Sequence, residues 1–145
     1  MRIVLDTSVI VEIDRKNETV IKIIKELIEQ DSSIIVSPIT ISEILTGSYL
    51  TKDSKKSVLE AKKILGQFLW IEFDAETAEK TAQYLAYLIA SGKIIEYQDV
   101  AIAATFKVTG ADYLLTLNKR HFELLPDLKG KAYEPAEFVK ILKKH

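Results

Sequence analysis

Short runs of consecutive apolar residues alternate along this chain with longer segments of helical periodicity. The runs cover residues 2–5, 33–37, 70–73 and 113–117, and a possible edge strand lies near 131–133. Because the apolar residues in the clearest runs are consecutive rather than alternating, we expect strands that are buried on both faces, as in a parallel sheet covered by helices. The pattern predicts an α/β fold with a mainly parallel central sheet of four to five strands.

The segments between the runs are predicted to be helices. They cover 7–15, 19–30, 40–50, 54–69, 75–92 and 99–110, and a last helix begins at Pro135. In the long helix over 75–92, spacing predicts that Ala78, Ala82, Leu85 and Leu88 or Ile89 face inward. No repeat, low-complexity segment or linker divides the chain, so residues 1–145 are expected to form a single domain.

Composition narrows the possible chemistry. The net charge is -1, from 20 basic and 21 acidic residues, so the chain lacks the overall positive charge of a protein held to nucleic acid by charge alone. Cysteine is absent, which excludes thiol nucleophiles and cysteine-bound zinc, and the two histidines, His121 and His145, poorly supply a Ser-His-Asp triad. With no apolar stretch near ~20 residues and no signal-peptide layout, we expect no membrane segment and a cytoplasmic location.

Three carboxylates follow or adjoin predicted strands. Asp6 interrupts the apolar run "IVLDTSVI" directly after the first strand, where burial is costly unless the charge has a partner. Glu43 is expected in the first turn of the helix after the second strand, and Asp99 at the start of the helix that leads into the fourth. Because ligands of open parallel sheets bind at the carboxyl ends of the strands, these residues can converge on one edge.

Helix capping is a simpler explanation for each residue taken singly. Asp6 and Asp99 stand where N-caps belong, and Thr40-x-x-Glu43 matches the capping box. Taken together, three anions at one edge repel each other unless a cation lies between them. Oxygen ligands without cysteine or a useful histidine suit Mg²⁺ or Mn²⁺, which we expect as the partner of Asp6. The hydroxyls of Thr7 and Ser8 could orient bound water or a phosphate oxygen.

Four segments in order resemble the motifs of PIN-domain nucleases, most closely the VapC-type toxins of VapBC toxin-antitoxin systems. They are "LDTSVIV", "ISEILTG", "QDVAIAATF" and "LLTLNKRHF", which lie within residues 3–122. The resemblance implies a three-layer α/β/α sandwich, Mg²⁺ or Mn²⁺ dependence and endonucleolytic cleavage of RNA. It also implies frequent homodimers and an antitoxin partner that masks the site.

The resemblance assigns metal ligation to Asp6, Glu43, Asp99 and Asn118, and it places Thr116 and Ser8 in the same site. In this family the segment "Thr-x-Asp/Asn" ends in an acidic or amide residue, and here that residue is Asn118. The amide removes a charge from the site, so the number of bound metal ions, one or two, stays open. Where the family often shows Arg-Asp-Phe, this chain has Arg120-His121-Phe122. RNA could be steered by Lys119 and Arg120 together with the lysines at 52, 55, 56, 62 and 63, although a lysine-rich helix face is more often simply solvated.

Two other functions remain open from the sequence. The neutral Asn118 is compatible with an inactive module that binds RNA or a protein partner without cutting. A phosphoacceptor or aspartate-nucleophile phosphatase also uses a carboxylate at a strand end, but the phosphatase pattern wants a second Asp at the position of Ser8.

Overall fold

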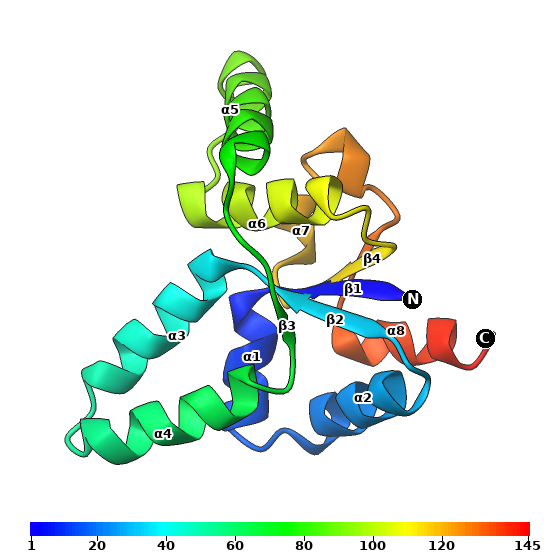
Figure 1. Cartoon of the computed structure of the whole chain (residues 1–145). Coiled ribbons are helices and arrows are strands. Elements are labelled where there is room, and N and C mark those ends of the chain that lie inside the picture. Colours follow the sequence, from blue (N-terminus) through cyan, green and yellow to red (C-terminus); the bar gives the residue numbers. More distant parts are fainter.

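The computed structural model describes all residues, 1–145, and has at its centre a five-stranded sheet in which all neighbouring strands are parallel (Figure 1). The strand order is β3-β2-β1-β4-β5, so β1 is central. The strands are β1 (Arg2–Leu5), β2 (Ser33–Val36), β3 (Leu69–Trp70), β4 (Tyr113–Leu115) and β5 (Ala132–Tyr133). The expected parallel α/β fold is confirmed.

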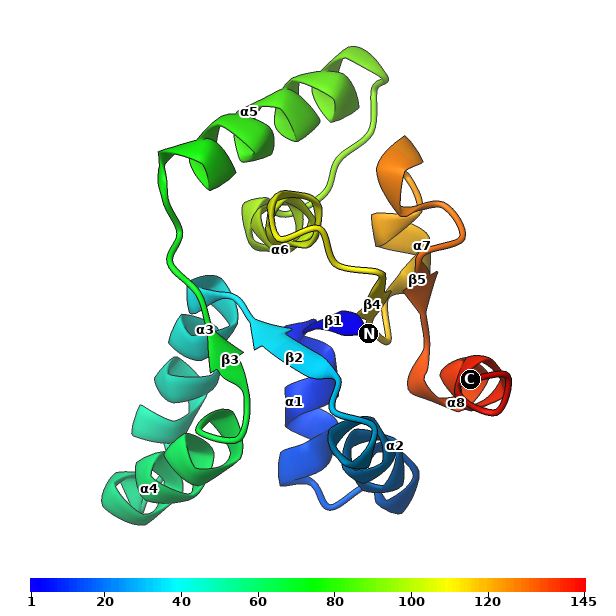
Figure 2. The same cartoon turned by 45° about the vertical axis from the view of Figure 1, so that its right-hand side comes forward.

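Helices cover both faces of the sheet and make three layers, which are visible in Figures 1 and 2. One face carries α1 (Thr7–Asp14), α2 (Glu18–Glu29), α4 (Ser54–Leu65) and α8 (Pro135–Leu142). The other carries α5 (Ala75–Ala90), α6 (Tyr97–Val108), α7 (Lys119–Phe122) and the 3-10 turn η1 (Pro126–Leu128). Helix α3 (Pro38–Tyr49) leads away from the sheet and packs along α4.

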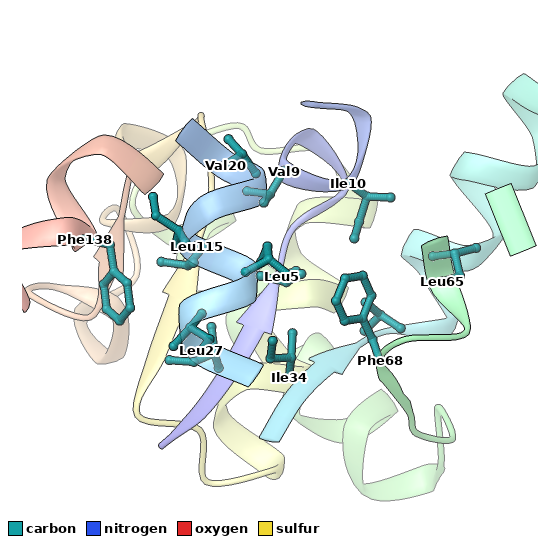
Figure 3. Packing of buried hydrophobic residues seen from close by; sticks show 14 of the residues in the cluster. Leu5, Val9, Ile10, Val20, Leu27, Ile34, Leu65, Phe68, Leu115 and Phe138 are labelled. Carbon is teal, nitrogen blue, oxygen red and sulfur yellow. The ribbon is translucent and has the colours of Figure 1, made fainter. Parts of the chain in front are cut away.

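Successive residues of β1 enter the two cores alternately, which explains their unbroken apolar character. Ile3 and Leu5 pack with α1, α2 and α8, whereas Val4 packs with α6 and α7, and none of the three is exposed. Figure 3 shows Leu5 among Val9, Ile34 and other side chains of the first core. Arg2 at the start of β1 is exposed, but a charge at Ile3, Val4 or Leu5 would face a dry core, so the first carboxylate comes only after the strand ends.

Helix α6 lies between the sheet and α5, and its small side chains allow close approach on both sides. Every residue from Val100 to Phe106 is buried. Alanines at 101, 103 and 104 remove bulk where the helix meets its neighbours. This packing fixes the first turn of α6, which carries Asp99, against the end of the sheet.

Some predicted boundaries were wrong. The third strand is Leu69–Trp70 rather than 70–73, and the helix predicted over 54–69 ends at Leu65, with Gly66 as its C-cap. The short helix α7 and the turn η1 lie in a segment to which the sequence pattern assigned no element.

The inward face of α5 also differs from the prediction. Its buried residues are Thr77, Thr81, Tyr84 and Leu88, whereas Ala78, Ala82 and Ile89 are exposed. Threonine is tolerated inside because its hydroxyl bonds locally: Thr81 donates to the carbonyl of Thr77 at 2.7 Å, and Thr77 donates to Asp74 at 2.8 Å.

No helix of the structure combines the length and apolar character needed to cross a membrane.

One polar contact ties α5 to η1. The hydroxyl of Tyr84 donates to Asp127 Oδ2 at 2.8 Å, and Lys107 Nζ of α6 lies 3.5 Å from Asp127 Oδ1. The hydrogen bond from Tyr84 and the charge of Lys107 hold the pKa of Asp127 below its ordinary value of 3.8.

We expect Tyr84→Phe to lower the free energy of unfolding by about 1 kcal/mol near pH 7, because the buried ring remains and only the bond to a carboxylate is lost. A carboxyl with a lowered pKa stabilises the fold above its ordinary pKa, so the difference should shrink as pH falls below 3.8. Urea unfolding at pH 7 and pH 3 measures both effects. Tyr87→Phe, at an exposed ring of the same helix, is the control, and equal losses in the two variants would contradict the assignment.

Candidate active site

The candidate site lies where the central strands β1 and β4 end. These strands are paired so that Leu5 is opposite Leu115, and the chain then places Asp6 beside Thr116. The amide of Asp6 donates to the carbonyl of Leu115 at 3.0 Å, which continues the pairing by one residue. Residues 110 positions apart therefore adjoin at the carboxyl edge of the sheet.

Asp6 is only 2% exposed, and its carboxylate accepts three hydrogen bonds from the protein. Oδ1 accepts from the amide of Thr7 at 2.8 Å, which makes Asp6 the N-cap of α1. Oδ2 accepts from the hydroxyls of Ser8 and Thr116, both at 2.7 Å. Burial of Asp6 therefore does not by itself require a cation. Of the two hydroxyls expected to orient water, that of Ser8 donates to Asp6 and that of Thr7 donates to Glu43.

The turn after β4 is bonded to the same hydroxyls. Thr116 Oγ1 accepts from the amide of Asn118 at 2.9 Å, and Ser8 Oγ accepts from the amide of Leu117 at 3.0 Å. Each hydroxyl thus donates to Asp6 and accepts from the turn. Asn118 then stands at the start of α7 with no side-chain cap bond, so its amide group remains available at the site.

Glu43 reaches the site from the second turn of α3, not from the first turn as predicted. The capping box with Thr40 is not formed, because α3 begins at Pro38 and Ser37 Oγ caps it by accepting from the amide of Ile39 at 3.1 Å. Instead, Thr7 Oγ1 donates to Glu43 Oε1 at 2.8 Å and lies 3.1 Å from Thr40 Oγ1. Thr7, which also contacts the buried Thr40, thus holds Glu43 toward Asp6.

Asp99 lies inside the first turn of α6 and does not cap it, since the N-cap is Glu96. Partial burial raises the pKa of the Asp99 carboxyl to about 6, the negative charges of Asp6 and Glu43 add to the increase, and the His121 imidazole opposes it. The nearest atoms of Asp99 and His121, Oδ2 and Nδ1, are 3.6 Å apart. The three carboxylates therefore lie near one another, as predicted, and the charges of Asp6 and Glu43 contribute to the raised pKa of Asp99.

One open pocket unites these side chains. Five of the six residues singled out from the sequence line it, namely Asp6, Ser8, Glu43, Asp99 and Asn118, and Thr116 lies behind Asp6. Sequence reasoning missed four further lining residues, Val11, Ile94, Ile95 and Glu96, and it noted His121 only as a departure from the family pattern. Ile94, Ile95 and Glu96 come shortly before Asp99 in the chain, and His121 comes shortly after Asn118. This nearness in sequence is the signal that could have identified them.

The donors of this pocket fit a hard divalent cation. Three carboxylates and an amide supply oxygen ligands, which Mg²⁺ and Mn²⁺ prefer. No three Asp, Glu or His side chains are already gathered at the spacing of a bound metal. Mg²⁺ keeps several waters and takes only one or two carboxylates directly, so an open arrangement of this kind suits a hydrated ion.

Comparison with known proteins places this site in context. The family model described as PIN domain matches residues 3–127. The chain is 30% identical over 125 residues to Ribonuclease VapC19 of Mycobacterium tuberculosis, which is 86% of this chain and 95% of that protein.

Two solved structures are similar to the chain over almost their whole length. VapBC2 from Rickettsia felis, bound to a DNA fragment from its promoter, aligns with a TM-score of 0.84 and 22% identity, over 92% of this chain and 98% of that one. FitAcB from Neisseria gonorrhoeae aligns with a TM-score of 0.72 and 31% identity, over 92% of this chain and 97% of that one.

We expect Thr116→Val to lower the free energy of unfolding by about 1–3 kcal/mol, because the buried Asp6 carboxylate and the amide of Asn118 each lose a partner. Thr105→Val is the matched control, since Thr105 is equally buried and its hydroxyl only adds a bond to a carbonyl within its own helix. Thermal or urea unfolding of the two variants compares them, and an equal effect would contradict the role of Thr116.

We expect Asp99→Asn to stabilise the metal-free protein by about 1 kcal/mol at pH 8, because it removes a charge that faces Asp6 and Glu43. A carboxyl with a raised pKa costs stability when it ionises, so the gain should be absent below pH 3.8, grow up to about pH 6 and stay constant above. Unfolding in the presence of a chelator across this range measures it. A variant that is no more stable than wild type at pH 8 would contradict the electrostatic account.

Proposed function

The chain belongs to the PIN domain family, and from this premise we propose that it is an endoribonuclease toxin that hydrolyses RNA phosphodiesters with the help of a divalent ion. The observation that carries the proposal is the pocket at the end of β1 and β4, which is lined by Asp6, Glu43, Asp99 and Asn118. Support for RNA as the substrate comes from the relative in Mycobacterium tuberculosis, a ribonuclease by name.

The ion would be Mg²⁺ or Mn²⁺, held by Asp6, Glu43, Asp99 and Asn118. When bound, such an ion lowers the pKa of a coordinated water and neutralises charge on a scissile phosphate. Asn118 contributes an amide oxygen without a charge and is a weaker ligand than a carboxylate, so one firmly bound ion is the minimum that this set supports.

The remaining residues act by holding the donors. Ser8 and Thr116 fix Asp6 through two hydroxyl bonds, and Thr7 joins Glu43 to the start of α1. Ile94 and Ile95 line the same pocket as Asp99 and add apolar surface to its rim. Three carboxylates are thus oriented before an ion or a substrate arrives, which reduces the reorganisation needed for the reaction.

The basic residues beside the site differ in their availability for RNA. Lys119 is committed to Glu137, with Nζ 2.9 Å from Oε2, and it also lies over the ring of Tyr133. Arg120 is exposed and has no hydrogen bond or ion pair within the chain. Of these two residues, we therefore propose that Arg120 contacts RNA and that Lys119 instead binds α8 through Glu137.

We also propose an antitoxin partner. Helix α3 buries only Thr40, and Tyr49 and Leu50 at its far end are exposed. A groove between α1, α3 and α4 shares Thr7 and Glu43 with the catalytic pocket. A partner segment seated in that groove would reach the carboxylates and exclude RNA.

A homodimer is a further proposal, and the surface offers apolar side chains for it. Ile89, at the end of α5, and Ile94, in the loop that follows, are 75% and 97% exposed. Ile94 also lines the catalytic pocket, so a second copy bound over this loop would border the site.

The deciding experiment incubates purified protein, free of any co-expressed partner, with a mixed RNA pool in EDTA, Mg²⁺ or Mn²⁺. We expect metal-dependent fragments from wild type and a loss of at least about 100-fold in Asp99→Asn and Glu43→Gln, because each loses an anionic ligand. Asp6→Asn should be as inactive, although its amide group faces three donors and its folding must be checked by circular dichroism.

Glu29→Gln, at an exposed carboxylate of α2, is the control and should cleave like wild type. Intact RNA with every metal, from folded wild-type protein, would contradict the nuclease assignment and favour a module that binds without cutting. Asn118→Asp would then test whether the missing charge is the reason.

A further inference from the structure

His121 is the only side chain lining the catalytic pocket that offers a nitrogen ligand for a metal. The other polar lining residues carry carboxylates, hydroxyls or the amide of Asn118. His121 comes from α7, one turn after Asn118, and its imidazole is 59% exposed toward solvent. It therefore stands at the rim of the pocket rather than in the core.

The position of the ring relative to Asp99 is informative. Nδ1 of His121 and Oδ2 of Asp99 are 3.6 Å apart, beyond the 2.7–3.2 Å range of good hydrogen bonds. With metal–ligand bonds of roughly 2.1 Å, two ligand atoms of one ion are separated by about 3–4 Å. The separation of 3.6 Å is that of an ion pair and also that of two neighbouring ligands of one ion, and no other side chain of the protein bonds to the imidazole.

We propose that His121 is a ligand of the divalent ion together with Asp99, and that this nitrogen makes the site prefer Mn²⁺ to Mg²⁺. The inference rests on the proposed function, since it concerns the ion of the same pocket. Mg²⁺ is a hard ion that favours oxygen, whereas imidazole suits transition metals, whose affinities for nitrogen sites rise from Mn²⁺ onward.

The proposal also gives a reason for the composition of the last motif. With Asn118 in place of an acidic residue, the anionic ligands number three, and a neutral imidazole completes the set without adding charge. An additional carboxylate would add to the repulsion among Asp6, Glu43 and Asp99, which line the same pocket. A nitrogen ligand strengthens binding of a transition metal without this cost.

The chain permits a direct test, because it contains only two histidines, His121 and His145, and no cysteine. Pulsed electron paramagnetic resonance of Mn²⁺ bound to the full chain detects a coordinated imidazole nitrogen through its hyperfine coupling. We expect this coupling in wild type and in His145→Ala, whose ring lies at the exposed C-terminal end, and its loss in His121→Ala.

Affinities give a second, independent readout. We expect His121→Ala to weaken Mn²⁺ binding at least about 10-fold and Mg²⁺ binding by less than about 3-fold, as measured by titration of Mn²⁺ and its competition with Mg²⁺. His121→Asp, which restores the Arg-Asp-Phe pattern, should shift the preference toward Mg²⁺. Because His121 is exposed, both variants are expected to fold.

Two results would overturn the inference: bound Mn²⁺ without nitrogen coupling in wild type, or equal weakening of both ions in His121→Ala. The second result would mean that His121 only positions Asp99. Both outcomes are distinct from failure of the proposed function, which is intact RNA in the cleavage assay whatever the ligands of the ion.

Discussion

The two hydroxyl bonds to the carboxylate of Asp6 are the interaction on which the site depends. Ser8 supplies one from α1 and Thr116 the other from the end of β4, each at 2.7 Å. The same hydroxyls accept amides of the turn after β4, so a single charged group fixes the ends of both central strands and the entry to α7. A charge-assisted network of this kind is strong only while every member is satisfied. The rest of the pocket is placed relative to this point.

The site concentrates negative charge in a protein that is almost neutral overall. Net charge is -1, yet three carboxylates line one pocket at the carboxyl edge of the sheet. Burial, together with the charges of Asp6 and Glu43, raises the pKa of Asp99, whereas the carboxylate of Asp6 accepts three hydrogen bonds. The ionised carboxyl of Asp99 therefore lowers the free energy of unfolding, a cost that is common at functional sites.

The sequence predicted the parallel sheet and the convergence of the carboxylates, because consecutive apolar residues and strand-end acids reflect constraints that act locally. It did not predict the partners of Asp6, since Thr116 is brought there only by the pairing of β1 with β4. Helix starts were misplaced by a few residues: the N-cap of α3 is Ser37 rather than Thr40, and the N-cap position of α6 is Glu96 rather than Asp99. The inward face of α5 was missed because apolar spacing does not reveal buried threonines that bond to their own helix.

The central position of β1 has a consequence for the growing polypeptide. The strand begins at the second residue, but its partner β4 begins at Tyr113, and Asp6 acquires its last donor only from Thr116. A nascent chain that ends before β4 carries three of the four motifs and no site, because β1 then has a free edge and Asp6 lacks its held position. During synthesis the carboxylates are therefore added before the residues that complete their pocket, and a fragment that ends before β4 lacks the contact between Asp6 and Thr116.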